Sequence, residues 1–195
     1  RCEYDKIKLI AIDGVFSMEG DIANLPKIVE LAEKYNASIM VDDAHGLGVL
    51  GQNGSGTSNH FGLTDKVDLI MGTFSKSLAS IGGFIAADLD TINYLKHNAR
   101  SLIFSASIAP ANAASVIAAV DLIQKEPERI QRLWDNTHYA MAALKKAGFD
   151  TGHSVTPIIP ILIRDDYKTF QLTKIALERA IFVNPVVSPA VPSTS

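Results

Sequence analysis

Short apolar runs of the kind that form buried strands recur in the first half of the chain. Ile7 to Ile12, Ser38 to Val41 and Val67 to Met71 are nearly unbroken in apolar character, which is typical of parallel strands covered on both faces. Between the first two runs, residues 24–35 carry apolar side chains at helical spacing behind Asn24, which can cap a helix. These segments predict a strand, helix, strand unit.

A fourth strand and two long helices are predicted after these runs. Residues 74–82 leave too little room for a crossover helix before the next apolar segment, Gly83 to Ala87, so we expect this strand to run antiparallel to its neighbours. Pro110 to Lys125 and Pro127 to Ala147 each carry one apolar face, which predicts two successive amphipathic helices.

Gly148 is a reasonable stop for the second of these helices, and we expect a domain boundary near it. Beyond it, Ile158 to Ile163 is an apolar run interrupted by a proline and predicts an edge strand, whereas Tyr167 to Ala180 predicts a helix. The expected fold is therefore α/β. Residues 1–148 are predicted to form a mostly parallel sheet with helices on both faces, and residues 149–195 to begin a smaller C-terminal α/β domain.

Composition narrows the class of protein. The chain is 47% hydrophobic and 20% charged, as in ordinary folded proteins. A net charge of -3 without a run of Lys or Arg argues against a nucleic-acid partner, and no apolar run approaches the ~20 residues of a membrane helix, so membrane association is not indicated. The single cysteine, Cys2, excludes an internal disulfide and fits a cytoplasmic protein. Because the chain opens on Arg1 without a methionine, we expect it to be part of a longer protein.

Polar side chains follow each of the three predicted parallel strands. The three clusters are Asp13 to Ser17, Asp42 to His45, and Gly72 to Lys76. Ligands of open parallel sheets bind beyond the carboxyl ends of the strands, where these clusters fall. The pattern predicts one active site at this edge.

The residue types in the clusters suit pyridoxal phosphate. Asp42 ends an apolar strand and needs a cationic partner, such as a protonated pyridine nitrogen. Thr73 and Ser75 offer hydroxyls to a phosphate, and Lys76 offers the amine for a Schiff base with an aldehyde.

His45 and Ser17 complete this set, because either could reach the ring or its phenolic oxygen. The residues alone leave a second interpretation open, in which Asp42, Asp43 and His45 hold a metal ion.

Gly46, Gly48 and Gly51 match the GxGxxG pattern of dinucleotide-binding folds. That pattern must open a helix, and the Gly-, Asn- and Ser-rich residues 52–62 cannot propagate one. We interpret the glycines as a tight loop that brings backbone close to the cofactor or to a partner subunit.

Three segments, residues 13–21, 41–48 and 72–77, resemble the α-oxoamine synthases, which are fold-type-I pyridoxal-phosphate enzymes. The similarity extends over essentially the whole chain and includes the spacings. It implies condensation of an amino acid with an acyl-CoA thioester and loss of carbon dioxide. Thr73 to Ser77, followed by Gly82 to Phe84, is most similar to the members that use L-serine and a long-chain acyl-CoA.

Several alternatives stay open beside that resemblance. Members that use alanine with pimeloyl-CoA or glycine with acetyl-CoA differ only in their substrates. Outside the enzymes, the chain could be a non-catalytic partner subunit, although Lys76 argues against this because a scaffold does not need a Schiff-base amine.

The resemblance implies catalytic roles for three residues. Lys76 would hold the cofactor and, once freed by the amino acid, take its α proton. Asp42 would keep the pyridine nitrogen protonated, and His45 would act beside the ring.

Binding roles follow from the same resemblance. Ser17 and His45 would bind the phenolic-oxygen side of the cofactor, and Thr73 its phosphate, with Ser75 beside it. Ser105 would reach the phosphate of the neighbouring subunit's cofactor, which implies a homodimer with its active site at the subunit interface.

Other parts of the family's active site are expected outside this sequence. The group that stacks on the ring would precede Arg1, and the arginine that grips the substrate carboxylate would follow Ser195. The 195 residues alone are therefore not expected to turn over substrate.

Overall fold

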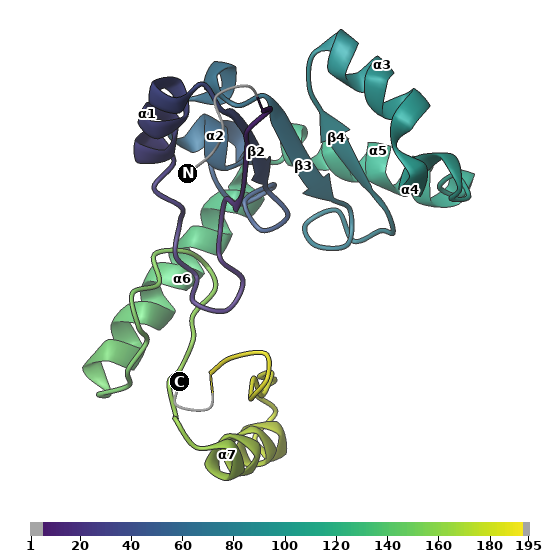
Figure 1. Cartoon of the computed structure of the whole chain (residues 1–195). Coiled ribbons are helices and arrows are strands. Elements are labelled where there is room, and N and C mark those ends of the chain that lie inside the picture. Colours follow the sequence, from purple (N-terminus) through teal and green to yellow (C-terminus); the bar gives the residue numbers. More distant parts are fainter. Residues whose placement is uncertain (1–5, 193–195) are drawn as a thin grey trace.

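The computed structural model of the chain describes residues 6–192, so Cys2 lies outside the described part. Strands and helices alternate in the first half, and helices dominate the second (Figure 1). The strands are β1 (Leu9–Asp13), β2 (Ser38–Asp42), β3 (Leu69–Thr73) and β4 (Gly83–Ala86). The helices are α1 (Leu25–Tyr35), α2 (Thr57–His60), α3 (Leu89–Asn98), α4 (Arg100–Ile103), α5 (Pro110–Lys125), α6 (Glu128–Lys146) and α7 (Asp166–Glu178), with 3₁₀ turns η1 (Gln52–Gly54) and η2 (Thr64–Lys66).

The sheet has the order β1-β2-β3-β4. β1, β2 and β3 are parallel, and β4 pairs antiparallel with β3. The predicted mostly parallel sheet and the predicted reversal of the fourth strand are both confirmed. Only nine residues separate β3 from β4, which permits a hairpin and excludes a helical crossover.

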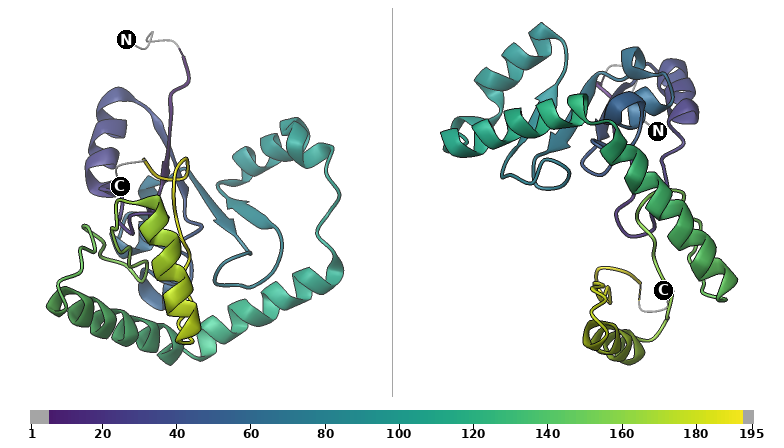
Figure 2. Two further views of the ribbon diagram at one scale, coloured as in Figure 1. Left: turned by 90° about the horizontal axis from the view of Figure 1, so that it is seen from below. Right: turned by 180° about the vertical axis from the view of Figure 1, so that it is seen from behind.

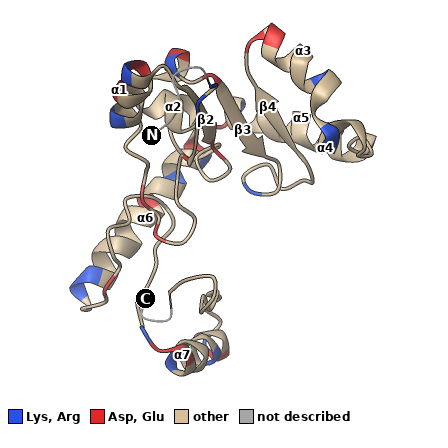
Figure 3. Cartoon of the chain, viewed as in Figure 1, with Lys and Arg blue, Asp and Glu red and all other residues tan. Residues whose placement is uncertain are grey.

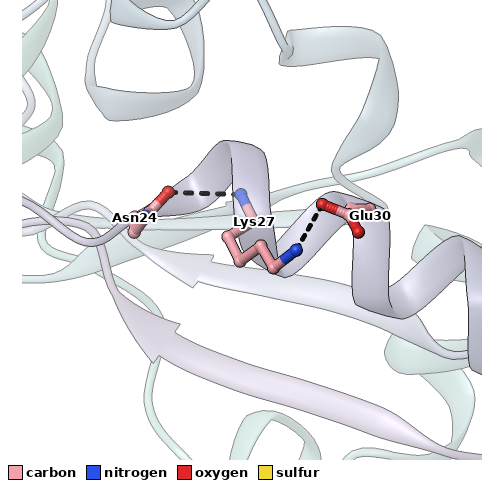
Figure 4. Close-up of polar contacts among 3 residues, drawn as sticks. All are labelled: Asn24, Lys27 and Glu30. Atoms are coloured by element: carbon pink, nitrogen blue, oxygen red, sulfur yellow. Dashed lines mark hydrogen bonds and ion pairs between the residues drawn. The ribbon is translucent and has the colours of Figure 1, made fainter.

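Helix α1 begins where the sequence predicts. The Asn24 side chain accepts a hydrogen bond from the Lys27 backbone N–H at 3.2 Å, and Lys27 Nζ pairs with Glu30 at 2.7 Å (Figure 4). The helix ends at Asn36, which adopts the left-handed conformation with φ 49°.

The buried core lies between α1 and one face of the sheet. Leu25, Val29 and Ala32 of α1 pack against Ile39 and Val41 of β2, and all five are buried. Burying an apolar side chain of this size contributes roughly 1.5–3 kcal/mol, so this layer fixes the sheet on which the site is built.

The opposite face of β1 and β2 is more open. Leu9 is 52% exposed, and Ala11 and Met40 border a hollow of about 420 Å³. Asp13 and Asp42 lie on this same open face.

Helices α5 and α6 follow one another across the molecule (Figure 2). The predicted amphipathic helices are confirmed, but the apolar face of α5 is only partly covered: Val116 is buried, whereas Ile117 is 67% exposed. α6 is fixed to the first half of the chain by Trp134, whose Nε1 donates to the Val49 carbonyl at 3.0 Å.

The predicted edge strand at residues 158–163 is wrong. These residues contain no strand. Pro157 and Pro160 lack the N–H that a ladder requires, and the Leu162 N–H donates to the Asp150 carbonyl at 2.9 Å. The neighbouring backbone is held by a different contact, from the Val155 N–H to the Gly20 carbonyl at 3.3 Å.

Two helices that the sequence pattern did not indicate lie between β4 and α5. α3 is capped by Asp88, whose side chain accepts from the Thr91 N–H at 2.8 Å. Neither α3 nor α4 has a buried residue among its own side chains.

Charges of both signs are interspersed on α1 and on α7 (Figure 3). Among residues 6–192, no helix is long and apolar enough to cross a bilayer.

Candidate active site

The carboxyl ends of the parallel strands meet at one edge of the sheet, as predicted. Asp13 at the end of β1 is the register partner of Asp42 at the end of β2. Asp42 in turn is aligned with Met71, two residues before Thr73 at the end of β3. Parallel pairing therefore brings together residues that lie as much as sixty positions apart in the sequence.

Asp42 is half-buried at this edge. Its Oδ1 accepts a hydrogen bond from the Ala44 backbone N–H at 3.0 Å, which fixes the side chain at the start of the following loop. Asp42 borders the open hollow together with Asp13 and Phe16. The carboxylate is thus both oriented and accessible.

The pKa of His45 depends on its burial and on the charges of three nearby side chains. Burial lowers the pKa of the imidazole below its ordinary value of 6.5, and the nearby Lys76 ammonium lowers it further. The carboxylates of Asp13 and Asp42 act in the opposite direction. The imidazole is consequently neutral at pH 7, within electrostatic reach of residues from all three strand ends.

Lys76 projects from the hairpin loop between β3 and β4. The loop is closed by the Phe74 N–H, which donates to the Gly82 carbonyl at 2.9 Å, and by the Ser80 N–H, which donates to the Phe74 carbonyl at 2.7 Å. Leu78 is buried and anchors the loop, whereas Lys76 is exposed. A hydrogen-bonded turn therefore presents an accessible amine.

Two hydroxyls lie side by side at the base of this loop. Thr73 Oγ1 and Ser75 Oγ are 2.8 Å apart, and the Ser75 N–H donates to Thr73 Oγ1 at 3.3 Å. Adjacent hydroxyls with a neighbouring backbone N–H are suited to an anionic oxygen such as that of a phosphate.

The two other predicted serines lie in different settings. Ser17 is half-buried in the turn that follows β1, at the same edge of the sheet. Ser105 is exposed after α4, and its hydroxyl donates to the Ser101 carbonyl. Ser105 does not line the cavity that contains His45 and Lys76.

A cavity of about 250 Å³ contains both His45 and Lys76. Its apolar wall comes in part from two regions of the chain that the sequence did not associate with the site, namely α6 and the segment 156–158. The residues of that wall are Leu47, Val49, Leu133, Thr156, Pro157 and Ile158. No motif marks Leu133 or Thr156, because each reaches the cavity only through the folding of distant segments.

Asp43 borders neither the hollow that contains Asp42 nor the cavity that contains His45. Its carboxylate is 2% exposed and accepts two hydrogen bonds from Thr57, one from the backbone N–H at 2.8 Å and one from Oγ1 at 2.6 Å. Burial is the largest influence on this carboxyl and raises its pKa. Within residues 6–192 there is no group of three His, Cys, Asp or Glu side chains placed to hold a metal ion.

The glycine-rich stretch after β2 is a tight loop, as interpreted. It leads into η1 and the four-residue α2 rather than into a long helix. Gly48 has φ +77°, and a Cβ there would lie 2.6 Å from Ser77 Cβ, next to Lys76. Ser77 Oγ donates to the Leu47 carbonyl at 2.8 Å. The loop therefore supports the segment that carries the lysine.

Comparison with known proteins shows the family of the chain. The whole chain, residues 1–195, matches the aminotransferase class I and II family. The chain belongs to this family.

Among curated proteins, the chain is 60% identical to serine palmitoyltransferase of Sphingobacterium spiritivorum, an alignment that covers 99% of this chain and 48% of the relative. It is 50% identical to 8-amino-7-oxononanoate synthase of Thermosipho melanesiensis, covering 95% of this chain and 47% of that protein. The chain thus spans about half the length of the curated relatives that it matches.

Solved structures share the fold. The serine palmitoyltransferase of Sphingomonas wittichii superposes with a TM-score of 0.92 at 30% identity, covering 100% of this chain and 49% of that one. A high-resolution structure of a serine palmitoyltransferase with pyridoxal phosphate gives a TM-score of 0.93 at 31% identity, with the same coverage. The expected fold-type-I architecture is confirmed.

Proposed function

We propose that this chain is part of a serine palmitoyltransferase, a pyridoxal-phosphate enzyme that condenses L-serine with a long-chain acyl-CoA, releases carbon dioxide and forms 3-ketosphinganine. The observation that carries the proposal is that His45, at the carboxyl-terminal edge of the sheet, lies within electrostatic reach of both Asp42 and Lys76. Relatives 60% identical over 97–99% of the chain are named serine palmitoyltransferase, which supports this choice of substrates.

The described residues fit the cofactor. They offer a carboxylate at Asp42, an exposed amine at Lys76 and two adjacent hydroxyls at Thr73 and Ser75. A ring nitrogen, an aldehyde and a phosphate need these three kinds of group. When bound, pyridoxal phosphate supplies an aldehyde that bonds to amines and a ring that accepts the electrons of a carbanion.

Each residue has a defined task in this proposal. Lys76 Nζ would hold the cofactor, and the same amine, once the amino acid has displaced it, would accept the α proton of that amino acid. Asp42 keeps a proton on the pyridine nitrogen, and the neutral His45, with Ser17, binds the phenolic-oxygen side. Thr73 and Ser75 bind the phosphate.

The proposal extends to the assembly. Ser105, exposed on this chain, would contact the cofactor phosphate of a second copy, so the enzyme would be a homodimer with its active site at the subunit interface. Residues 1–148 would form part of the cofactor-binding domain and residues 149–195 the beginning of the small domain. A cytoplasmic location, expected from the single cysteine, completes the proposal.

One alternative has specific support. Relatives about 50% identical are named 8-amino-7-oxononanoate synthase, and such an enzyme would keep the same cofactor residues while using alanine and pimeloyl-CoA. The cofactor chemistry and the substrate identity therefore need separate tests.

The decisive experiment uses the full-length protein that contains this chain. We expect added pyridoxal phosphate to produce a visible absorption band that borohydride abolishes and that Lys76→Ala lacks. A panel of L-serine, alanine and glycine with palmitoyl-CoA, pimeloyl-CoA and acetyl-CoA should give product from L-serine with palmitoyl-CoA. Absence of the band in the wild type would refute the cofactor assignment, and product only from alanine with pimeloyl-CoA would replace the substrate assignment.

A further inference from the structure

Asp43 forms a buried cluster that is separate from the residues assigned to the cofactor. Both of its carboxylate oxygens accept hydrogen bonds from Thr57, the first residue of α2, which is itself fully buried. A buried carboxylate with two such donors is a strong structural anchor, because removing it would leave the donors without a partner.

Three glycines surround this pair of side chains. A Cβ at Gly46 or at Gly56 would overlap the Asp43 carboxylate, and a Cβ at Gly14 would lie 2.5 Å from Thr57 Oγ1. Gly56 also has φ +100°, which favours glycine. Backbone segments from the end of β1, the end of β2 and the start of α2 therefore meet at one carboxylate.

The loop that leaves this cluster carries the site. His45 is two residues after Asp43, and Gly48 packs against Ser77 beside Lys76. The loop returns to the cluster at Gly56 and Thr57, so the Asp43–Thr57 pair closes it at both ends. Displacement of this closure would move His45 and remove the support behind the Lys76 loop.

We propose that Asp43 is a positioning residue that holds His45 and the Lys76 loop in place through its hydrogen bonds to Thr57. This inference rests on the proposed function for its effect on cofactor binding. In this proposal the hydrogen bonds and shape of the Asp43 side chain, and not its charge, position the loop. The substitution Asp43→Asn can reproduce that shape, since an amide oxygen accepts from the Thr57 N–H while the amide N–H donates to Thr57 Oγ1.

The test compares Asp43→Ala, Asp43→Asn and Thr57→Val in the full-length protein. Asp68→Ala is the matched control: Asp68 Oδ2 accepts from the Ile39 N–H at 2.7 Å, a similar bond at the far end of β2. Three quantities are measured: amide hydrogen exchange of residues 46–57 without cofactor, the His45 pKa by NMR, and the dissociation constant for pyridoxal phosphate.

We expect Asp43→Ala to accelerate exchange in residues 46–57, to shift the His45 pKa and to weaken cofactor binding roughly tenfold or more. Thr57→Val should change the exchange rate, the His45 pKa and the cofactor affinity in the same direction, but less than Asp43→Ala does. Asp43→Asn should restore values close to wild type, and Asp68→Ala should leave the His45 pKa and the cofactor affinity unchanged.

Two results would overturn the inference. The first is unchanged exchange and an unchanged His45 pKa in both Asp43→Ala and Thr57→Val. The second is an Asp43→Asn protein that is folded but as impaired as Asp43→Ala, which would assign the role to the charge. If Asp43→Ala does not fold, Thr57→Val and Asp43→Asn still decide. A wild-type protein that binds no pyridoxal phosphate would refute the proposed function alone, because exchange and the His45 pKa are measured without cofactor.

Discussion

Neighbouring residues at the end of β2 face different surroundings and consequently have different chemistry. Asp42 lies at an open hollow, whereas Asp43, one position later, is buried against Thr57. His45 is partly buried between an ammonium and two carboxylates. The sequence presents two equivalent acids followed by a histidine, and only their surroundings make one a candidate partner of a ring nitrogen and the other an internal anchor.

The His45 pKa provides a test of the proposed cluster at this scale. Because the Lys76 ammonium lowers the His45 pKa, Lys76→Gln should raise it; because the Asp42 carboxylate raises it, Asp42→Asn should lower it. NMR titration of the cofactor-free full-length protein measures both, with His45→Gln used for assignment. Shifts of the opposite sign, or no shift in either variant, would contradict the proximity of these groups.

The same pKa has a consequence for stability. The folded-state pKa lies below the unfolded value near 6.5, so the unfolded chain binds more protons as the pH falls through this range. His45 therefore destabilises the fold progressively below about pH 6.5. His45→Gln lacks this contribution. Its free energy of unfolding should therefore fall less than that of the wild type between neutral pH and pH 5, as measured by denaturant unfolding at several pH values. An equally steep decline in the variant would contradict the assignment.

At the scale of secondary structure, local pattern predicted the elements that pack against the core. β1, β2, β3 and α1 have clear apolar patterns because each buries a defined face. The pattern did not predict α3 and α4, which bury none of their side chains, but it did predict α7, which buries none either, so the lack of burial does not by itself explain the two missed helices. The segment 158–163 is apolar like a strand but has no strand partner; of its residues, Ile158 borders the cavity.

The loop after β2 allows a matched comparison of two glycines. Gly48 and Gly62 have similar φ angles, +77° and +66°, but a Cβ at Gly48 would meet Ser77 whereas Gly62 has open space around it. Gly62→Ala should cost about 1 kcal/mol from backbone strain alone, and Gly48→Ala about 3 kcal/mol from strain and overlap together. Denaturant unfolding of the full-length variants measures the difference, and equal losses would show that Gly48 does not pack against the lysine loop as described.

At the scale of the whole chain, a buried polar contact joins the beginning of the sheet to the segment after α6. Thr156 is 1% exposed, and its Oγ1 donates to the Gly20 carbonyl at 2.9 Å. Ser154 Oγ also contacts the Ile158 carbonyl within this segment. The contact places Pro157 and Ile158 against the cavity that contains His45 and Lys76.

Removal of this contact should loosen the attachment of residues 151–158. Thr156→Val keeps the shape of the side chain but removes the shortest hydrogen bond to the Gly20 carbonyl, which keeps only the longer contacts from the Val155 N–H at 3.3 Å and Ser154 Oγ at 3.5 Å. The loss should cost about 1 kcal/mol and accelerate proteolysis near Gly152. Thr173→Val is the control, because Thr173 Oγ1 bonds at 2.9 Å to the Thr169 carbonyl within α7. Equal protease sensitivity in the two variants would argue against a role for Thr156 in holding this segment.

The sequence by itself determined the strands of the sheet, the antiparallel fourth strand, the long helices and the three polar clusters that follow the parallel strands. These features are encoded locally, in apolar periodicity, turn residues and the length of connections. Only the tertiary structure decided that Asp43 turns inward to Thr57 and that Leu133 and Pro157 line the cavity. It also left 158–163 without strand pairing. These outcomes depend on contacts between segments that are distant in the sequence. The residues next to a side chain in the sequence do not show which distant segment will bury it.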